Sequence, residues 1–360
     1  MNARGLLRAL AVFWTVLLIV LVGGGAWLHS LGPLPDAPPP SAMAEPAAPP
    51  PPATAEAPAP RPAAQPAPPP AAPEPPALRA GAAQRPVGEP TIAPPEPALL
   101  MAGRHGPVPR VAPDGRTSIR TYARAFDRAE TRPQVGVIVG GIGLFALHGE
   151  EAIRRLPGGV TLAFSPYAPR PEPLVERARA RGMEVLIGLP LEPAGFPVSA
   201  DPGDRALLTG LTIAENLDRL DWALSRVQGY VGAIGALGPM RGERFAANAE
   251  LLGTVQGVLR DRGLLYVDAR PGGPAPVRAW GRTVDLVLDE PSATRGEVER
   301  RLAELEALAR TRGTALGLVG DPAPSVIAAI LAWSQGLEER GAVLAPVSAL
   351  IRRPAEAAQR

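Results

Sequence analysis

Between residues 135 and 345, short apolar runs alternate regularly with longer segments of helical periodicity. The apolar runs predict buried strands at residues 135–139, 160–164, 184–187, 230–234, 264–267, 284–288, 315–319 and 343–345. The periodic segments predict helices at residues 150–156, 172–181, 213–227, 246–262, 295–310 and 326–340. This alternation is typical of parallel βαβ units. Seven or eight such strands in about 220 residues favour a (β/α) barrel over a small doubly wound sheet.

The composition changes sharply near residue 131. Most of the 47 Pro residues lie before residue 110, and residues 33–98 are largely Pro and Ala. A segment of this kind has too few large apolar residues to build a core. We therefore predict a disordered Pro/Ala-rich linker at residues 33–131, a folded domain at 132–353 and a tail at 354–360.

Residues 10–28 are almost wholly apolar and carry no charge. About 19 such residues are long enough to span a bilayer as a helix. Arg4 and Arg8 precede the run and no Arg follows until Arg61, so the positive-inside rule places the N-terminus in the cytoplasm. We predict that residues 1–32 form a single-pass anchor in a bacterial inner membrane, with the remaining chain in the periplasm. A cleaved signal peptide is the alternative, but no clear small-x-small cleavage site follows the run.

Missing residue types exclude several chemistries. The chain has no Lys and no Cys, which excludes a Schiff-base lysine, a Walker-type lysine, a disulfide and a thiol nucleophile. His148 is the one His after residue 131, so a zinc site built on two histidines cannot form in the predicted domain. The net charge of +2 gives no support for a nucleic-acid partner, and no cofactor is predicted.

The site of a (β/α) barrel lies at the C-terminal ends of its strands. The first strand ends in Gly140 and Gly141, which carry no functional side chain. The turn after it is not Gly-x-Gly-x-x-Gly, so we expect a tight turn rather than a phosphate site. We expect His148 to cap or flank the first helix. No Gly-x-Ser-x-Gly elbow occurs, which argues against a serine hydrolase.

Four acidic residues follow other predicted strands: Glu192, Asp268, Asp289 and Asp321. If they converge, an oxygen-only site of this kind would suit Mg²⁺ or Ca²⁺ rather than zinc. The alternative is that they are solvated loop acids, helix caps or partners of neighbouring Arg residues such as Arg270.

Three local motifs follow one another in a distinctive order. Residues 163–168 are Ala-Phe-Ser-Pro-Tyr-Ala, residues 189–193 are Leu-Pro-Leu-Glu-Pro, and residues 266–270 are Tyr-Val-Asp-Ala-Arg. Over about 134–350 the chain resembles the divergent polysaccharide deacetylases, a branch of the (β/α)-barrel carbohydrate deacetylases. The matching family motifs are Ala-Phe-x-Pro-Tyr-Ala, His-Leu-Pro-Met-Glu-Pro and Phe-x-Asp-Ser-Arg. The resemblance implies a cleft that includes Tyr167, Glu192, Asp268 and Arg270.

The chain departs from the family where the reactive residues are expected. The family has Asp-Asp where this chain has Gly140-Gly141, and His where it has Gly188 and Ala236. A late family His is replaced by Asp321, whereas Asp289 matches the Asp of a Phe-Leu-Asp motif. The resemblance implies that deacetylation needs a divalent metal held by Asp and His, which polarises the amide carbonyl and activates water. Those ligand positions are degenerate here.

We therefore interpret the domain as an inactive relative that binds an envelope glycan or an envelope protein. The alternative is an active carbohydrate deacetylase that hydrolyses C–N amide bonds with a metal site rebuilt from carboxylates. A third hypothesis, an envelope-spanning adaptor, rests on the predicted anchor and Pro-rich arm alone, because the C-terminal domain is too regularly βαβ for it.

Overall fold

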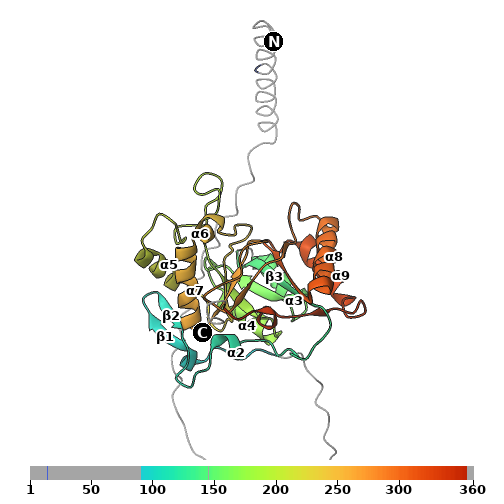
Figure 1. Cartoon of the computed structure of the whole chain (residues 1–360), viewed down its shortest axis with the longest axis horizontal. Coiled ribbons are helices and arrows are strands. Elements are labelled where there is room, and N and C mark those ends of the chain that lie inside the picture. The colour runs from blue at the N-terminus through green and yellow to red at the C-terminus, as the bar shows by residue number, and fades with distance from the viewer. Residues whose placement is uncertain (1–13, 15–90, 145, 355–360) are drawn as a thin grey trace, which may run out of the picture. The chain divides into compact units, whose positions relative to one another are not determined.

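The computed structural model describes residue 14 and residues 91–144 and 146–354 (Figure 1). All of these except Trp14 belong to one unit, Arg79–Arg360. The predicted anchor at residues 10–28, Trp14 apart, and the predicted linker before residue 91 lie outside the described residues. None of the helices within the described ranges is both long and apolar enough to cross a membrane.

A parallel sheet forms the centre of this unit, as the sequence predicts. Its strands are β3 (Gln134–Ile142), β4 (Thr161–Phe164), β5 (Val185–Gly188), β6 (Gly232–Ile234), β7 (Leu265–Asp268), β8 (Gly281–Thr283), β9 (Leu286–Val287), β10 (Thr314–Val319) and β11 (Val343–Leu344). The order across the sheet is β8-β7-β6-β5-β4-β3-β10-β9, and β11 also pairs with β3. These strands pair with one another in parallel.

Residues 281–287 connect the two ends of the sheet. β8 pairs with β7, and after two residues β9 pairs with β10. One extended segment therefore bridges the sheet ends, which is consistent with the predicted (β/α) barrel. The sequence predicts this segment as a single strand at residues 284–288 and misses β8, because Gly281, Arg282 and Thr283 form no apolar run.

Helices cover the outside of the sheet. They are α3 (Ala146–Arg155), α4 (Glu172–Ala180), α5 (Ile213–Ser225), α6 (Glu243–Ala247), α7 (Ala249–Asp261), α8 (Arg295–Arg312), α9 (Pro324–Gln335) and α10 (Val347–Leu350). Figure 1 shows α5 and α7 on one side of β3 and α8 and α9 on the other. The predicted helix at residues 246–262 is divided into α6 and α7 at Asn248, whose side chain caps α7 by accepting hydrogen bonds from the N–H groups of residues 250 and 251.

Alternate residues of each strand enter two separate apolar clusters, as side chains in a strand point to opposite faces. Val137 and Val139 pack under the helices, whereas Ile138 joins the cluster inside the barrel. Leu186 and Leu318 join the same inner cluster. The barrel interior is therefore filled by side chains, and residues two positions further along β3, β5 and β10 also point inward.

The folded unit begins earlier than the boundary predicted at residue 132. Residues 91–131 contain η1 (Pro97–Leu99), the antiparallel hairpin of β1 (Leu100–Gly103) and β2 (Gly106–Pro109), and α2 (Ser118–Thr121). Ile92, Leu99 and Tyr122 are buried in the inner cluster. Residues 91–131 are thus not a disordered linker, because their isolated apolar side chains are covered by the barrel.

Candidate functional site

The uppermost inward-facing positions of three strands are glycines. Gly140 in β3 follows inward-facing Ile138, Gly188 in β5 follows Leu186, and Gly320 follows Leu318 of β10. These positions lie at the C-terminal ends of the strands, where a (β/α) barrel carries its chemistry. In this chain no side chain projects from any of the three into the mouth of the barrel.

The β6–α6 loop occupies the space that side chains would need at these positions. A Cβ atom added to Gly188 would lie 2.7 Å from the carbonyl oxygen of Ala236, and one added to Gly320 would lie 3.0 Å from that of Gly238. A Cβ on Gly140 would lie 3.0 Å from the carbonyl oxygen of Val319. These neighbours are backbone atoms, which cannot rotate away. The three glycines therefore belong to a closed mouth.

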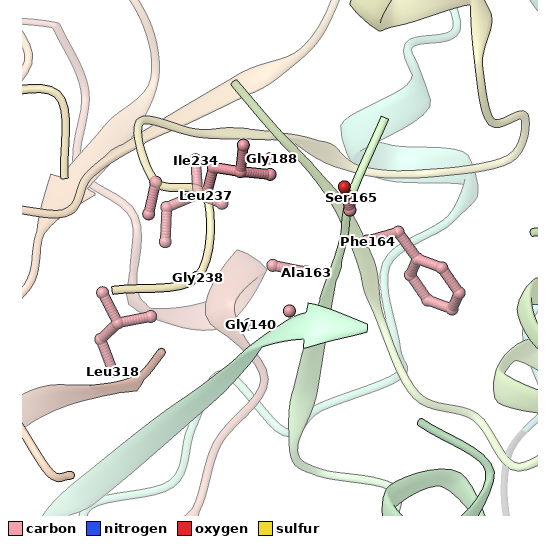
Figure 2. Close-up of a pocket in the computed structure, with 11 residues that line it drawn as sticks. Gly140, Ala163, Phe164, Ser165, Gly188, Ile234, Leu237, Gly238 and Leu318 are labelled. Carbon is pink, nitrogen blue, oxygen red and sulfur yellow. The ribbon is translucent and has the colours of Figure 1, made fainter. Parts of the chain in front are cut away.

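The remaining hollow at the mouth is very small. Its volume is about 10 Å³, which is room for the centre of about one water molecule. Figure 2 shows its lining, in which Ser165 carries the side-chain oxygen and the Phe164 ring points away from Gly140 and Gly188. None of the six predicted cleft residues lines this hollow.

Gly141 is a glycine for a conformational reason as well. Its φ is +66°, in the left-handed region that favours glycine. A Cβ there would also lie 2.9 Å from the carbonyl oxygen of Gly320. The Gly140-Gly141 turn therefore cannot carry the Asp pair of the resembled motif without movement of the backbone.

Glu192 is a buried structural carboxylate. Its Oε2 accepts hydrogen bonds from the backbone N–H and the hydroxyl of Thr209, and its Oε1 lies 3.1 Å from Nε of Arg244. Its carbonyl oxygen accepts hydrogen bonds from the N–H groups of Arg244 and Phe245 in α6. The residue thus fixes the start of α6 against the segment that follows β5.

Asp268 and Arg270 form a closed local pair. Oδ1 of Asp268 accepts hydrogen bonds from Nε of Arg270 at 3.0 Å, and Oδ2 accepts one from Nη2 at 2.7 Å. The backbone N–H of Arg270 also donates to Oδ1. The hydrogen bonds to Asp268 raise the pKa of Arg270. Asp268 lies at an outward-facing register, with Tyr266, so the pair holds a loop rather than facing the mouth.

Tyr167 lies on the flank of the barrel. Its hydroxyl oxygen accepts a hydrogen bond from the backbone N–H of Arg205, and its ring centroid is 5.1 Å from that of Trp222. Partial burial raises the pKa of the phenol. The matched motif residue thus supports the loop at 201–206 and contributes no group to the hollow.

Asp289 and Asp321 are the two of the four predicted acidic residues that the structure brings together. Oδ2 of Asp289 accepts hydrogen bonds from the backbone N–H groups of Gly320 and Asp321, at 2.9 and 3.0 Å. Burial raises the pKa of Asp289. The Oδ1 atoms of both aspartates are buried and have no hydrogen-bond partner among the residues that the structure describes.

His148 is a neighbour of this pair that the sequence did not place there. It lies in the first turn of α3, and its Nδ1 is 3.8 Å from Oδ1 of Asp321. The expectation that His148 caps or flanks the first helix is wrong, because α3 begins at Ala146 and includes His148. Its proximity to Asp321 depends on the contact between α3 and the β10–α9 loop. Residue spacing along the chain carries no signal for such a contact.

The described residues do not fit a catalytic metal. No group of three or more His, Cys, Asp and Glu side chains within them is arranged to hold an ion. The strand-end positions are glycines whose Cβ directions are blocked by backbone. A hydrolytic metal centre needs several ligands and an open position for water, and a hollow of about 10 Å³ offers neither.

Comparison with known proteins assigns this barrel to a family. Residues 137–351 match the sequence profile of the family described as divergent polysaccharide deacetylase. The chain belongs to this family. A divergent polysaccharide deacetylase fold accounts for the barrel and for the retained motifs around Tyr167, Glu192 and Asp268.

Relatives with solved structures or known sequences are consistent with this assignment. The crystal structure of an uncharacterized protein from Agrobacterium tumefaciens is 33% identical, with a TM-score of 0.62, and the match covers 68% of this chain and 99% of that one. An uncharacterized protein of Haemophilus influenzae is 24% identical over 60% of this chain and 75% of its own length. A family 4 carbohydrate esterase from Streptomyces lividans, in complex with acetate, is 16% identical, with a TM-score of 0.38 over 62% of this chain and 98% of that one. That last score is too low to support a functional argument.

Proposed function

We propose that this divergent polysaccharide deacetylase is a non-catalytic member of its family, which binds a cell-envelope glycan or an envelope protein without turning it over. The observation that carries the proposal is the layer of strand-end glycines. Gly188 and Gly320 face backbone oxygens of the β6–α6 loop at distances that leave no room for a ligand side chain. The loss of the reactive groups and the loss of the space for them coincide.

The chemistry of amide hydrolysis supports the same proposal. A metal would supply a polarised carbonyl and an activated water. A general acid or base contributes about 10²–10⁴-fold to such a reaction. The retained family acids Glu192 and Asp268 are held by Thr209, Arg244 and Arg270, so neither carboxylate is available to a substrate.

A surface on the barrel flank is the better location for a glycan. A shallow basin of about 350 Å³ is lined by the charged side chains of Arg104, Asp204, Arg205, Glu215, Asp218 and Arg219. This volume is at the lower end of the range for ligand sites. Carboxylates accept hydrogen bonds from sugar hydroxyls, and guanidinium groups donate to them. Tyr167 supports this basin through its bond to the N–H of Arg205.

The proposed location is the periplasmic face of a bacterial inner membrane. Arg4 and Arg8 before the apolar run at residues 10–28 support this orientation. The Pro/Ala-rich segment before residue 91 would then separate the folded unit from the membrane.

The central test combines metal analysis with an acetate-release assay on the full-length chain. We expect no stoichiometric zinc, and no acetate from acetylated chitooligosaccharides or peptidoglycan fragments beside an active deacetylase as positive control. Binding to isolated peptidoglycan is measured in parallel, and the double variant Arg104→Ala/Arg205→Ala is expected to weaken it. Arg177→Ala, an exposed residue paired with Glu150 on another face, is the matched control. Metal-dependent acetate release would refute the proposal.

The second candidate is an active deacetylase with a rebuilt site at His148, Asp289 and Asp321. It is favoured by the two buried Oδ1 atoms, which have no hydrogen-bond partner within the described ranges, and by the approach of His148 to Asp321. If this candidate is correct, acetate release occurs and is abolished by Asp321→Asn and by His148→Ala. If acetate is absent in the parent chain, the candidate is excluded.

A further inference from the structure

A cavity on the flank of the barrel lies apart from the strand ends. It has a volume of about 200 Å³ and is formed by α4, by the end of α5 with the residues that follow it, and by Pro95 from the N-terminal segment. Its apolar wall consists of Pro95, Pro171, Val175 and Val227. The cavity shares no residue with the hollow at the mouth.

A buried cation faces this cavity. Arg179 is only 6% exposed, and its Nη1 donates a hydrogen bond to the carbonyl oxygen of Gln228 at 2.9 Å. That is the one hydrogen bond its side chain makes within the described residues, although a guanidinium has five N–H donors. No carboxylate in that part of the chain lies within 4.0 Å of Arg179, so the buried charge is not neutralised by an ion pair. Charges that are buried in this way are usually paired.

Three further charged side chains line the same cavity. Arg226 follows the end of α5, and its Nε donates to the carbonyl oxygen of Pro166. Glu172 and Glu176 project from α4 and are exposed. Neither glutamate makes a hydrogen bond or ion pair within the described residues, and Arg226 has no ion pair there. The cavity thus presents two cations and two carboxylates with no ion pair among them in the described part of the chain, although the charge of Glu176 acts on Arg179 from a longer distance.

We propose that this cavity binds a small zwitterion with the head group of a free α-amino acid. Its carboxylate bonds to Arg179 and Arg226, whose planar donors match a carboxylate. Its ammonium bonds to Glu172 and Glu176. Both charges of an amino acid are attached to one carbon, so a single small molecule can reach both signs. The apolar wall, including Val175 and Val227, contacts a small aliphatic side chain.

The charges that line the cavity and the volume of the cavity together indicate a small amino acid as the ligand. An anion alone would leave Glu172 and Glu176 repelling it, and a cation alone would leave Arg179 unpaired. A cavity of about 200 Å³ is smaller than typical sites for drug-sized ligands, which begin near 300 Å³. An oligosaccharide is therefore too large for the enclosed part of this cavity.

The test is calorimetric titration of the full-length chain with three probes: alanine, acetate and ethylammonium. We expect saturable binding of alanine, and at least about tenfold weaker binding of each single-charge probe, because each probe lacks the charge-assisted hydrogen bonds of the other charged group. Equal binding of acetate and alanine, or no saturable binding of alanine, would overturn the proposal.

Variants assign the binding to this cavity. Arg179→Met keeps the aliphatic stem and is expected to weaken alanine binding at least about tenfold. Glu176→Gln changes an exposed side chain, so it tests the ammonium contact in a chain that folds normally. Arg177→Gln, on the same helix but paired with Glu150 outside the cavity, is expected to bind alanine as the parent does. Unchanged alanine affinity in Glu176→Gln would contradict the proposed zwitterion geometry.

Discussion

Replacing Gly188 with alanine adds one methyl group at the closed mouth of the barrel. In an open cleft this change would be harmless, because Gly188 has no positive φ that a side chain would strain. In this structure the new Cβ lies 2.7 Å from the carbonyl oxygen of Ala236 and 3.3 Å from that of Phe164. The carbonyl of Ala236 in the β6–α6 loop and that of Phe164 at the end of β4 would therefore have to move apart.

The expected cost follows from overpacking. Extra methyl groups in a well-packed interior typically cost about 1–3 kcal/mol. For a domain of roughly 150–250 residues, each kcal/mol lowers the melting temperature by about 2–4 °C. Gly188→Ala should thus lower the melting temperature by about 2–12 °C, and Gly188→His, which restores the family residue, should lower it further.

The matched control is Gly257→Ala in the middle of α7. A Cβ on Gly257 meets no atom within 4 Å, so the change should stabilise the chain by about 0.5–1 kcal/mol through helix propensity. Thermal and urea unfolding of both variants measure the contrast. A Gly188→Ala variant as stable as its parent would show that the mouth is not filled. A side chain at position 188 would then be sterically possible.

Three other changes test separate parts of the structure. Asp289→Asn keeps an acceptor for the N–H groups of residues 320 and 321. Burial raises the pKa of Asp289 above its ordinary value of 3.8, so ionisation of this carboxyl group at higher pH destabilises the folded parent. The variant cannot ionise there. Its free energy of unfolding, measured in urea, should therefore rise relative to that of the parent as the pH is raised from 3 to 7. Leu99→Ala should cost about 2–5 kcal/mol, and no loss would restore the idea that residues 91–131 are only a linker. Thr212→Ala removes the capping box with Glu215 at the start of α5 and should cost about 0.5–2 kcal/mol of unfolding free energy.

The barrel was predictable from the sequence because its elements have strong periods. The runs at β3, β4 and β10 are buried on both faces, so they appear as continuous apolar stretches. α5 begins after Thr212, a good N-cap residue, and its apolar stripe faces the sheet. Such strands and helices can be predicted from their own residues, without knowledge of the elements that they pack against.

The segment at residues 91–131 gave no comparable signal. Ile92, Leu99 and Tyr122 are single apolar residues among prolines and polar residues, with no strand or helix period. Their burial is decided by the barrel surface that receives them: the N–H of Ile92 donates to the carbonyl of Arg179, and the Tyr122 hydroxyl accepts from the N–H of Glu96. A segment that is ordered by another segment cannot be recognised from its own pattern.

The contacts of the candidate site also could not be predicted from the sequence. The sequence reveals that Gly140, Gly188 and Ala236 replace polar residues of the resembled motifs, and this much suggests lost ligands. It does not reveal that the carbonyl of Ala236 occupies the place next to Gly188, because that contact joins two loops. The same is true of His148 and Asp321, which meet only in the folded chain.

The closed mouth also explains why single reversions should not restore chemistry. A histidine at position 188 requires the carbonyl of Ala236 to move, and a side chain at position 320 requires Gly238 to move. Both neighbours belong to one loop, whose turn is held by reciprocal hydrogen bonds between Leu237 and Met240. Arg241, at the end of that loop, pairs with Glu290 across the mouth. The glycines and the loop are therefore mutually dependent. The small residues allow the loop to lie close to the strand ends, and the loop in that position excludes larger side chains. Any return to metal binding would need the loop to open and several ligands to appear together, since each change alone costs stability and supplies no site.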